Sequence, residues 1–568
     1  SSDVCSSDLV VAVWQASDVA GVVTPGVNPL WPPLQDMPMP LLAGPLVEHV
    51  GQAVAMVLAQ DAATAQEAAL LVQVSLEALP AWGADDPGAS VVHQVAHTHG
   101  QAQGQVAVVA RADLTVPRLL AMAMEPRACV AQWQGDNQRL KVWLGSQTPA
   151  RAQADIARAL GLALPQVHLI SPHVGGAFGS KASISPEDIL VALAAHRLRT
   201  TVQWKASRSE EFLSGQHGRA ARLQGQLAVD AQGHFLSLQA QLHYTLGAWL
   251  PYSALVPMRN AARILPGPYR VDRCDITGQS RRSHTAPVGI YRGAGRPEAA
   301  LLMETLIDQA ARLLGLDPVQ MRLRNLIDAS AMPYRTPTGE TLDSGDFPQL
   351  LRLACERFGY DQERERQRQR RAQGEWVGLG VALYVEPCGQ GWESARVTWH
   401  ADGQVSVASG SPDQGQGHAV TFGHIAASTL GVPLAQHDGI AQMIEHNHLL
   451  YQDMQDPVQF LNNAWSGGIA EYWPYAHEKP AVAMPASEVD KFTRYSHLMA
   501  ASQGFVVQEI LSSYFFDEHR CVLDVGAGKG RFVSELAAHA PHLMFKMFDL
   551  PPVLALAREG LRAKGLGD

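Results

Sequence analysis

The chain has 568 residues, of which 46% are hydrophobic and 17% charged, and its net charge is −10 at pH 7. A chain of this length is longer than a domain with a single hydrophobic core usually is, so several domains are expected. The sequence has no long basic run and no stretch of about 18 apolar residues, which argues against a nucleic-acid groove and against a membrane span.

The six cysteines are scattered, and none forms a CxxC pair: Cys5, Cys129, Cys274, Cys355, Cys388 and Cys521. This distribution argues against a disulfide framework and against a cysteine-ligated iron–sulfur cluster. A cytoplasmic location is expected, with any electron-transfer centre on another polypeptide. Residues 1–9 repeat Ser-Ser-Asp without the regions of a signal peptide, resemble translated adapter sequence, and are expected to be a non-native leader.

The pattern over the first 160 residues predicts alternating strands and helices. Residues 52–59 are expected to form a buried strand, and residues 62–74 a helix capped by Asp61. Residues 83–105 are interpreted as a surface connection. A strand at 140–144 should lead into a helix that Thr148 caps, Pro149 opens and Gly161 ends.

Strands are predicted between residues 202 and 277, followed by a helix at 297–314 with one apolar face: Leu302, Leu306, Ala310 and Leu313. Residues 361–371 are expected to be a solvated helix or linker. Residues 377–410 alternate like paired strands, with a hairpin turn at Asp402-Gly403. Composition changes near Gln436, beyond which a strand–glycine–helix unit is predicted at 521–540, with one further strand and helix after it.

Three turns rich in glycine or glutamine stand out, at 174–181, 290–298 and 413–418. Glycine permits positive φ and lets backbone N–H groups approach a ligand closely. With 48–54, 124–128, 145–149, 314–325 and 334–339, these turns resemble the large, molybdopterin-binding subunits of xanthine dehydrogenase, aldehyde oxidase and aerobic carbon-monoxide dehydrogenase. The resemblance implies a mixed α/β (α+β) multidomain fold, incomplete at both ends. It places an a/b hammerhead-like domain at 10–107 and a molybdopterin-binding domain at 108–436.

The resemblance also implies roles for individual residues around a molybdenum held by the pterin dithiolene rather than by protein ligands. Gln147 would donate its amide to an oxo ligand, although it could instead be a loop residue that caps the next helix. Arg292 would hold the metal's surroundings, although alone it would more often be a surface ion-pair residue. The cofactor would be lined by Gly176, Ala177, Phe178 and Gly179, with Phe178 beside the metal, and its pterin and phosphates gripped by Gln414, Gly415, Gln416 and Gly417.

Departures from the family pattern bear on the substrate. Gly293 stands where copper-containing carbon-monoxide dehydrogenases carry cysteine, Ala182 where xanthine-type enzymes carry glutamate, and Ala294 where they carry phenylalanine. The resemblance therefore implies oxidation of a small aldehyde, heterocycle or related carbon centre. The implied cofactor is the cytosine dinucleotide form, and the implied partners are an iron–sulfur subunit and an FAD subunit.

The family's catalytic general base, a glutamate near the C-terminus, has no match in this chain. Such a base is needed to make a bound water nucleophilic near neutral pH. Glu386 is a candidate for this general base. It lies upstream of the third turn in a strand-like pattern, however, and is interpreted as structural. The catalytic residues are thus left unknown.

The last part of the chain carries an apolar strand, GxGxG and a helix, with Asp524, Gly526, Gly528 and Asp549 at the positions of a nucleotide-type site. It resembles hydroxyneurosporene-type S-adenosylmethionine-dependent O-methyltransferases, with a helical segment at 437–515 and a partial Rossmann-like segment at 516–568. Asp549 would accept hydrogen bonds from the ribose. An NAD-binding turn is the alternative, less favoured because the spacing is not GxGxxG. The catalytic histidine of such enzymes would lie beyond residue 568.

Three hypotheses of different classes follow. The chain is a molybdenum hydroxylase large subunit, or a methyltransferase fragment with an unrelated N-terminal domain, or a non-catalytic composite of two truncated reading frames. The motifs favour the first for family identity. The missing catalytic residues favour the third for the activity of these 568 residues.

Overall fold

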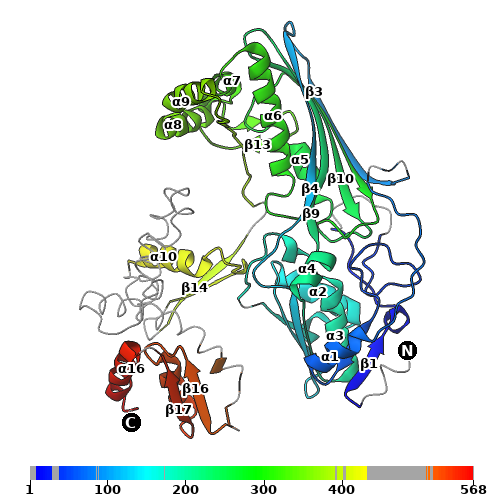
Figure 1. The fold of residues 1–568 in the computed structure, drawn as a ribbon, viewed down its shortest axis with the longest axis vertical. Coiled ribbons are helices and arrows are strands. Elements are labelled where there is room, and N and C mark those ends of the chain that lie inside the picture. The colour runs from blue at the N-terminus through cyan, green and yellow to red at the C-terminus, as the bar shows by residue number, and fades with distance from the viewer. Residues whose placement is uncertain are drawn as a thin grey trace. The chain divides into compact units, whose positions relative to one another are not determined.

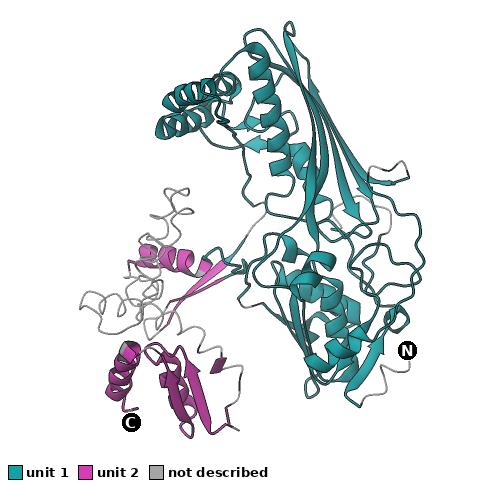
Figure 2. Ribbon diagram, viewed as in Figure 1, with its two compact units in different colours: residues 1–394, 409–417 teal, residues 395–408, 418–568 magenta. Residues whose placement is uncertain are grey.

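The computed structural model describes residues 8–28, 37–431 and 507–566, apart from 85, 87, 172, 390–392, 401–404, 508–509, 512–513, 515, 518 and 550. Two compact units are present: residues 1–394 with 409–417, and residues 395–408 with 418–568 (Figure 2). The predicted junction near Gln436 and most of the predicted helical segment at 437–515 lie outside the described residues.

The first unit contains a five-stranded sheet of order β3-β11-β10-β9-β4 (Figure 1). Only β10 and β11 run parallel to each other; the other pairs are antiparallel. Its strands are β3 (Val91–Gly100), β4 (Val108–Leu120), β9 (His217–Val229), β10 (Phe235–Gly247) and β11 (Arg273–Arg282). The helices α5 (Val256–Ile264) and α6 (Arg296–Leu314) pack on this sheet, and a shared apolar core includes Leu223, Leu238, Leu302 and Leu306.

A second core in the same unit surrounds a four-stranded sheet of order β7-β6-β5-β8. The strands are β5 (Ala128–Gln134), β6 (Arg139–Leu144), β7 (Val167–Ile170) and β8 (Thr201–Lys205), with the helices α2 (Pro149–Leu160), α3 (Pro186–Leu198) and α4 (Arg208–Ser214). Residues 189–195 of α3 are all buried, so this helix is central to the core. The antiparallel pair β1 (Val10–Trp14) and β2 (Met56–Ala59) contributes Trp14 and Leu58 to the same core.

Smaller elements complete the described chain. The first unit adds α1 (Ala62–Leu70), α7 (Pro318–Asn325), β12 (Tyr334–Arg335), β13 (Thr341–Leu342), α8 (Phe347–Phe358), α9 (Tyr360–Ala372) and the 3-10 turns Ala16–Val19, Leu164–Gln166, Ser180–Ala182 and Ala329–Ala331. Elsewhere lie β14 (Ala395–Trp399), β15 (Val405–Ser409), α10 (His418–Leu430), β16 (Cys521–Val525), α15 (Arg531–His539), β17 (Met544–Phe548) and α16 (Pro551–Ala563). In the second unit β16 and β17 are parallel neighbours.

Several helix ends agree with the sequence because local chemistry determines them, whereas the helix predicted at 62–74 already ends at Leu70. The Asp61 side chain accepts a hydrogen bond from the Thr64 N–H and caps α1, as predicted. Gly161 and Gly315 end α2 and α6 in the left-handed conformation. Thr148 precedes α2, but its hydroxyl donates to the Ala182 carbonyl, so the predicted cap by this side chain is wrong.

Four further predictions about elements are corrected by the structure. The stretch 83–105 is not only a connection, because β3 lies within it and pairs with β11. The strand predicted at 52–59 shortens to Met56–Ala59. Leu313 is exposed rather than part of the apolar face of α6. Residues 377–389 form no strand, and pairing begins only with β14.

Candidate functional site

The loop between β6 and α2 carries Gln147 and is bound to the first glycine-rich turn. The Gln147 N–H donates to the Lys181 carbonyl at 3.0 Å, and the Gln147 side-chain Oε1 accepts from the Gly179 N–H at 2.9 Å. A backbone N–H can only donate, so the amide atom that meets it must be the oxygen. The Nε2 end of Gln147 therefore remains as the donor end that a ligand oxygen would need.

The first turn, residues 174–181, joins β7 to α3 and has a left-handed backbone at three positions. Gly176 has φ of 95°, Gly179 of 101°, and Phe178, which is not a glycine, of 54°. A Cβ at Gly179 would lie 2.6 Å from Ile290 Cγ2. Phe178 is 43% exposed as a residue, so its ring is available to line a ligand.

The second turn, residues 290–295, precedes α6 and contacts the first one directly. The Arg292 N–H donates to the Phe178 carbonyl at 2.8 Å, and the Ala294 N–H closes the turn onto the Tyr291 carbonyl at 2.8 Å. The structure therefore brings together Gln147, the 176–179 turn and Arg292. Because β6 and β7 belong to one core and α6 to the other, these contacts join segments of the two cores of the first unit.

The third turn is held by hydrogen bonds within itself. The Gly415 N–H donates to the Asp413 carboxylate at 3.0 Å, the Gln414 N–H to Gln416 Oε1 at 2.6 Å, and Gln416 Nε2 to the Pro412 carbonyl at 3.0 Å. None of these three bonds reaches the first two turns. Placement of Gln414 to Gly417 at a common site thus stays a prediction.

Backbone strain gathers where the first two turns meet. Among the described non-glycine residues with positive φ are Phe178, Arg219, Ala220 and Ala294, at 54°, 65°, 59° and 41°. Phe178 and Ala294 lie in the two turns, and the Arg219 guanidinium donates to the Arg292 carbonyl at 2.7 Å. Such conformations cost of order 1–3 kcal/mol each and cluster at functional sites. Sequence reasoning missed Arg219, because a strand pattern contains no signal for positive φ.

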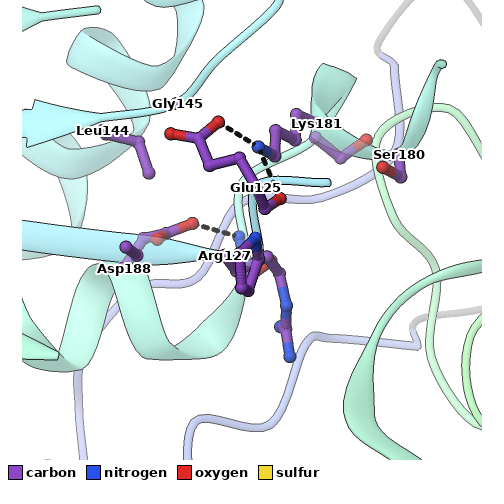
Figure 3. A pocket seen from close by; sticks show the side chains of 11 residues that line it. Glu125, Arg127, Leu144, Gly145, Ser180, Lys181 and Asp188 are labelled. Atoms are coloured by element: carbon purple, nitrogen blue, oxygen red, sulfur yellow. Dashed lines mark hydrogen bonds and ion pairs between the residues drawn. The ribbon is translucent and has the colours of Figure 1, made fainter. Parts of the chain in front are cut away.

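A small pocket behind the first turn is built around an ion pair (Figure 3). Lys181 Nζ lies 2.5 Å from Glu125 Oε2 and 3.2 Å from the Glu125 carbonyl, and the same carboxylate accepts from the Gly175 N–H at 2.8 Å. The cavity measures about 20 Å³, room for one water molecule. Gly145 and Ser180 line it, whereas Gln147, Phe178 and Arg292 do not. The predicted site residues therefore do not share this pocket.

Lys181 should matter for the stability of the first turn, because its side chain is only 5% exposed and is paired with Glu125. We expect Lys181→Met to lower the free energy of unfolding by about 1–2 kcal/mol, a loss moderated by the partial exposure of Glu125. Urea unfolding measures this effect. The control is Lys205→Met at an exposed position of β8, expected to change stability by no more than about 0.5 kcal/mol. Equal losses in both variants would contradict the assignment.

Asp188, at the start of α3, lines the same pocket. Its Oδ2 accepts from the Ser185 N–H at 2.8 Å, while its buried Oδ1 has no partner among the residues that the structure describes. Burial raises the pKa of this carboxyl to about 7, against 3.8 ordinarily. The folded chain therefore binds more protons than the unfolded chain between these two pKa values, and the Asp188 contribution to stability falls as pH rises toward 7.

A pH series of unfolding measurements tests this behaviour. Between pH 5 and 7 the native chain should lose up to about 2 kcal/mol relative to Asp188→Asn, which cannot ionise at this position. The difference between the two curves isolates Asp188 from other titrating groups. Parallel curves for the two proteins would contradict the raised pKa.

Glu386 lies beside the second turn but is engaged in an ion pair. Its Oε1 accepts from Arg296 Nη1, at the start of α6, at 2.8 Å. The Glu386 side chain is 44% exposed. The pairing agrees with the interpretation of Glu386 as a structural residue.

Comparison with known proteins identifies the family of the chain up to residue 438. Residues 89–326 and 353–438 match family models of a molybdopterin cofactor-binding domain, and residues 2–80 match the a/b hammerhead domain of aldehyde oxidase and xanthine dehydrogenase. The nicotine 6-hydroxylase large subunit of Paenarthrobacter nicotinovorans is 30% identical over 431 residues. The structure of quinoline 2-oxidoreductase from Pseudomonas putida 86 superposes with a TM-score of 0.71 at 32% identity. This part of the chain belongs to the molybdenum hydroxylase large subunits.

The chain spans about half the length of the curated large subunits it matches. The alignment with nicotine 6-hydroxylase covers 70% of this chain and 52% of the relative, and the superposition on quinoline 2-oxidoreductase covers 76% and 59%. A carbon monoxide dehydrogenase large chain from Hydrogenophaga pseudoflava is 28% identical, over 73% of this chain and 59% of the relative. Among the helices that the structure describes, none has the length and apolar character needed to cross a bilayer.

The second unit holds the other predicted site. Residues 451–566 match the family model of an O-methyltransferase domain. The Gly528 N–H donates to Asp549 Oδ2 at 2.7 Å, and Gly526 and Gly528 have φ of 76° and 53°. Burial and the charge of Asp549 raise the pKa of Asp524. The structure therefore brings together the GxGxG turn and both predicted carboxylates.

Proposed function

We propose that the first part of the chain holds a molybdopterin cofactor where the turns at 145–149, 174–181 and 290–295 meet, and serves as a molybdenum hydroxylase large subunit. The observation that carries this proposal is the hydrogen bond from the Gly179 N–H to Gln147 Oε1. This bond joins two of the turns and aims the amide so that its donor end is left for a ligand oxygen. The bond from Arg292 to Phe178 adds the third turn.

Each predicted residue then has a distinct task. Gln147 donates from Nε2. The left-handed backbone at Gly176, Phe178 and Gly179, with Ala177 between them, lets the cofactor lie close to the chain. Arg292 keeps the surroundings of the metal positive. Gln414, Gly415, Gln416 and Gly417 would grip the pterin and its phosphates, through backbone N–H groups and amide side chains. When bound, the cofactor supplies the redox centre that oxidises a carbon centre with oxygen from water.

The proposed substrate is a small aldehyde or heterocycle, and the names of the relatives favour a nitrogen heterocycle. Nicotine 6-hydroxylase and quinoline 2-oxidoreductase are both named for such compounds. Ala182 directly follows the first turn and Ala294 lies in the second, and both have small side chains. Electrons would pass to separate iron–sulfur and FAD subunits, in keeping with relatives named as a large subunit and as a subunit of a complex.

Metal and nucleotide analysis tests the proposal. The full chain should be purified from a host that makes molybdenum cofactor. Because the cofactor is expected to bind tightly, the purified chain should carry about one molybdenum atom per chain. Acid hydrolysis should release cytidine monophosphate if the cofactor is the proposed dinucleotide form. A chain without molybdenum, from a host that loads a known hydroxylase, contradicts the proposed function. Release of another nucleotide, or of none, contradicts only the cofactor form.

A second proposal concerns the methyltransferase-like part, where Gly528 and Asp549 are joined. We infer that the glycine turn binds S-adenosylmethionine, with Asp549 accepting from the ribose hydroxyls. Calorimetric titration of the full chain should give saturable heat with S-adenosylmethionine and none with NAD. The composite hypothesis predicts the opposite for both cofactors: neither molybdenum nor S-adenosylmethionine would bind.

A further inference from the structure

Arg219 contacts two residues of the turn that carries Arg292, and one residue at the start of α6. Its Nη2 donates to the Arg292 carbonyl at 2.7 Å, and its Nη1 to Glu298 Oε2 at 3.1 Å. Its guanidinium carbon lies 4.8 Å from the centre of the Tyr291 ring. One planar side chain thus holds the residue before Arg292, the backbone of Arg292 itself and the first turn of α6.

The setting of Arg219 is unusual for a strand residue. Arg219 and Ala220 lie at the beginning of β9 with φ of 65° and 59°, where regular strand residues have negative φ. Gly218 packs against Tyr291 so closely that a Cβ there would lie 2.3 Å from the Tyr291 Cβ. The kinked backbone brings β9 against the second turn, and this is how the Arg219 side chain reaches its three partners.

Burial makes these contacts strong. The side chain of Arg219 is 11% exposed and that of Glu298 1% exposed. The second carboxylate oxygen of Glu298, Oε1, is buried and has no partner in the described part of the chain, and Arg219 is the charged group paired with this carboxylate. Removing a partner from such a pair costs several kcal/mol because the remaining charge is left unpaired.

We infer that Arg219 is a positioning residue: it fixes the Arg292 turn against the Phe178 turn in the geometry that cofactor binding requires. This inference rests on the proposed function of the two turns. Arg219 does not touch the cofactor in this account; it acts through the backbone of Arg292. A lysine at this position would keep the charge but could not reach the carbonyl, the carboxylate and the ring at once.

The test compares variants of the full chain made in a host that supplies molybdenum cofactor. Arg219→Met removes all three contacts, and Arg219→Lys keeps the charge. Arg222→Met is the matched control, because Arg222 lies on the same strand but pairs with Asp113 at an exposed site, where the two side chains are 46% and 47% exposed. The readouts are molybdenum content by mass spectrometry, the Mo(V) electron paramagnetic resonance spectrum after partial reduction, and the urea unfolding midpoint.

We expect Arg219→Met to lower molybdenum content at least about fivefold, because the Arg292 turn loses all three contacts that preorganise it for the cofactor. Arg219→Lys should unfold at nearly the native midpoint while its remaining Mo(V) spectrum shifts, a change that a merely structural role would not cause. Arg222→Met should match the native chain in all three readouts. Should Arg219→Met fail to fold, Arg219→Lys decides.

Two negative outcomes are distinguishable. If the native chain contains no molybdenum, the proposed function fails, and this inference fails with it. If the native chain is loaded but Arg219→Lys has native molybdenum content and a native spectrum, Arg219 has no positioning role and only this inference is overturned.

Discussion

Gly179→Ala is expected to abolish cofactor binding and to lower the free energy of unfolding by about 3 kcal/mol. Two effects add at this position. The backbone has φ of 101°, which an alanine tolerates poorly, and the new Cβ would lie 2.6 Å from Ile290 Cγ2 and 2.9 Å from the Ile290 carbonyl oxygen. To relieve this clash, the first turn must move away from the second. This movement also breaks the hydrogen bond from the Gly179 N–H to Gln147 Oε1.

Gly161→Ala is the control that separates the cost of positive φ from the cost of a steric clash. Gly161 also has positive φ, 67°, but no atom of the described residues lies within 4 Å of a Cβ built there. This variant should lose only about 1 kcal/mol and keep its molybdenum. Both variants are measured by urea unfolding and by metal content. If Gly179→Ala behaved like Gly161→Ala, the close approach of the two turns would be disproved.

Arg322→Met should cause a second large loss, about 3–5 kcal/mol in the free energy of unfolding. Arg322 is fully buried in α7 and pairs with Glu304 and Asp308 of α6, each at 2.8 Å. Glu304 also accepts from the Tyr269 hydroxyl at 2.7 Å and from the Leu383 N–H at 3.0 Å. Without the arginine, the Glu304 carboxylate would stay buried among groups that cannot neutralise its charge.

Arg324→Met is the matched control, because Arg324 lies on the same helix but is exposed. Its loss should stay within about 0.5 kcal/mol. Chemical unfolding with a fluorescence readout compares the two variants. Similar losses would contradict the view that the Arg322 network fixes α6, the helix that follows the Arg292 turn.

Residues beside a helix end predicted where the helix begins or stops. The sequence predicted less well which strands pair and which side chains are buried. Asp61, Gly161 and Gly315 could be assigned from sequence because a cap depends on the residues beside it. Strand β3 was missed because residues 91–100 contain three histidines and pair with β11, far along the chain. Leu313 fits a helical apolar stripe, yet its exposure depends on what packs against α6.

The candidate site likewise contains turns that could be identified from sequence and supporting residues that could not. The resemblance identified the turns, and the structure shows that Gln147, Phe178 and Arg292 lie in segments that bond to one another. Their roles toward a cofactor stay predictions. Supporting residues such as Arg219 and Lys181 could not be assigned, because their importance comes from long-range contacts, with Arg292 and Glu125 respectively. The positive φ of Arg219 likewise depends on tertiary packing.

X-ray absorption at the molybdenum edge of the purified full chain is the most direct test of a metal held by a pterin at these turns. The account predicts sulfur neighbours from the dithiolene together with oxygen neighbours, in the native chain and in Gly161→Ala alike. A spectrum with oxygen neighbours alone, as from adsorbed molybdate, or no molybdenum signal at all, would contradict it.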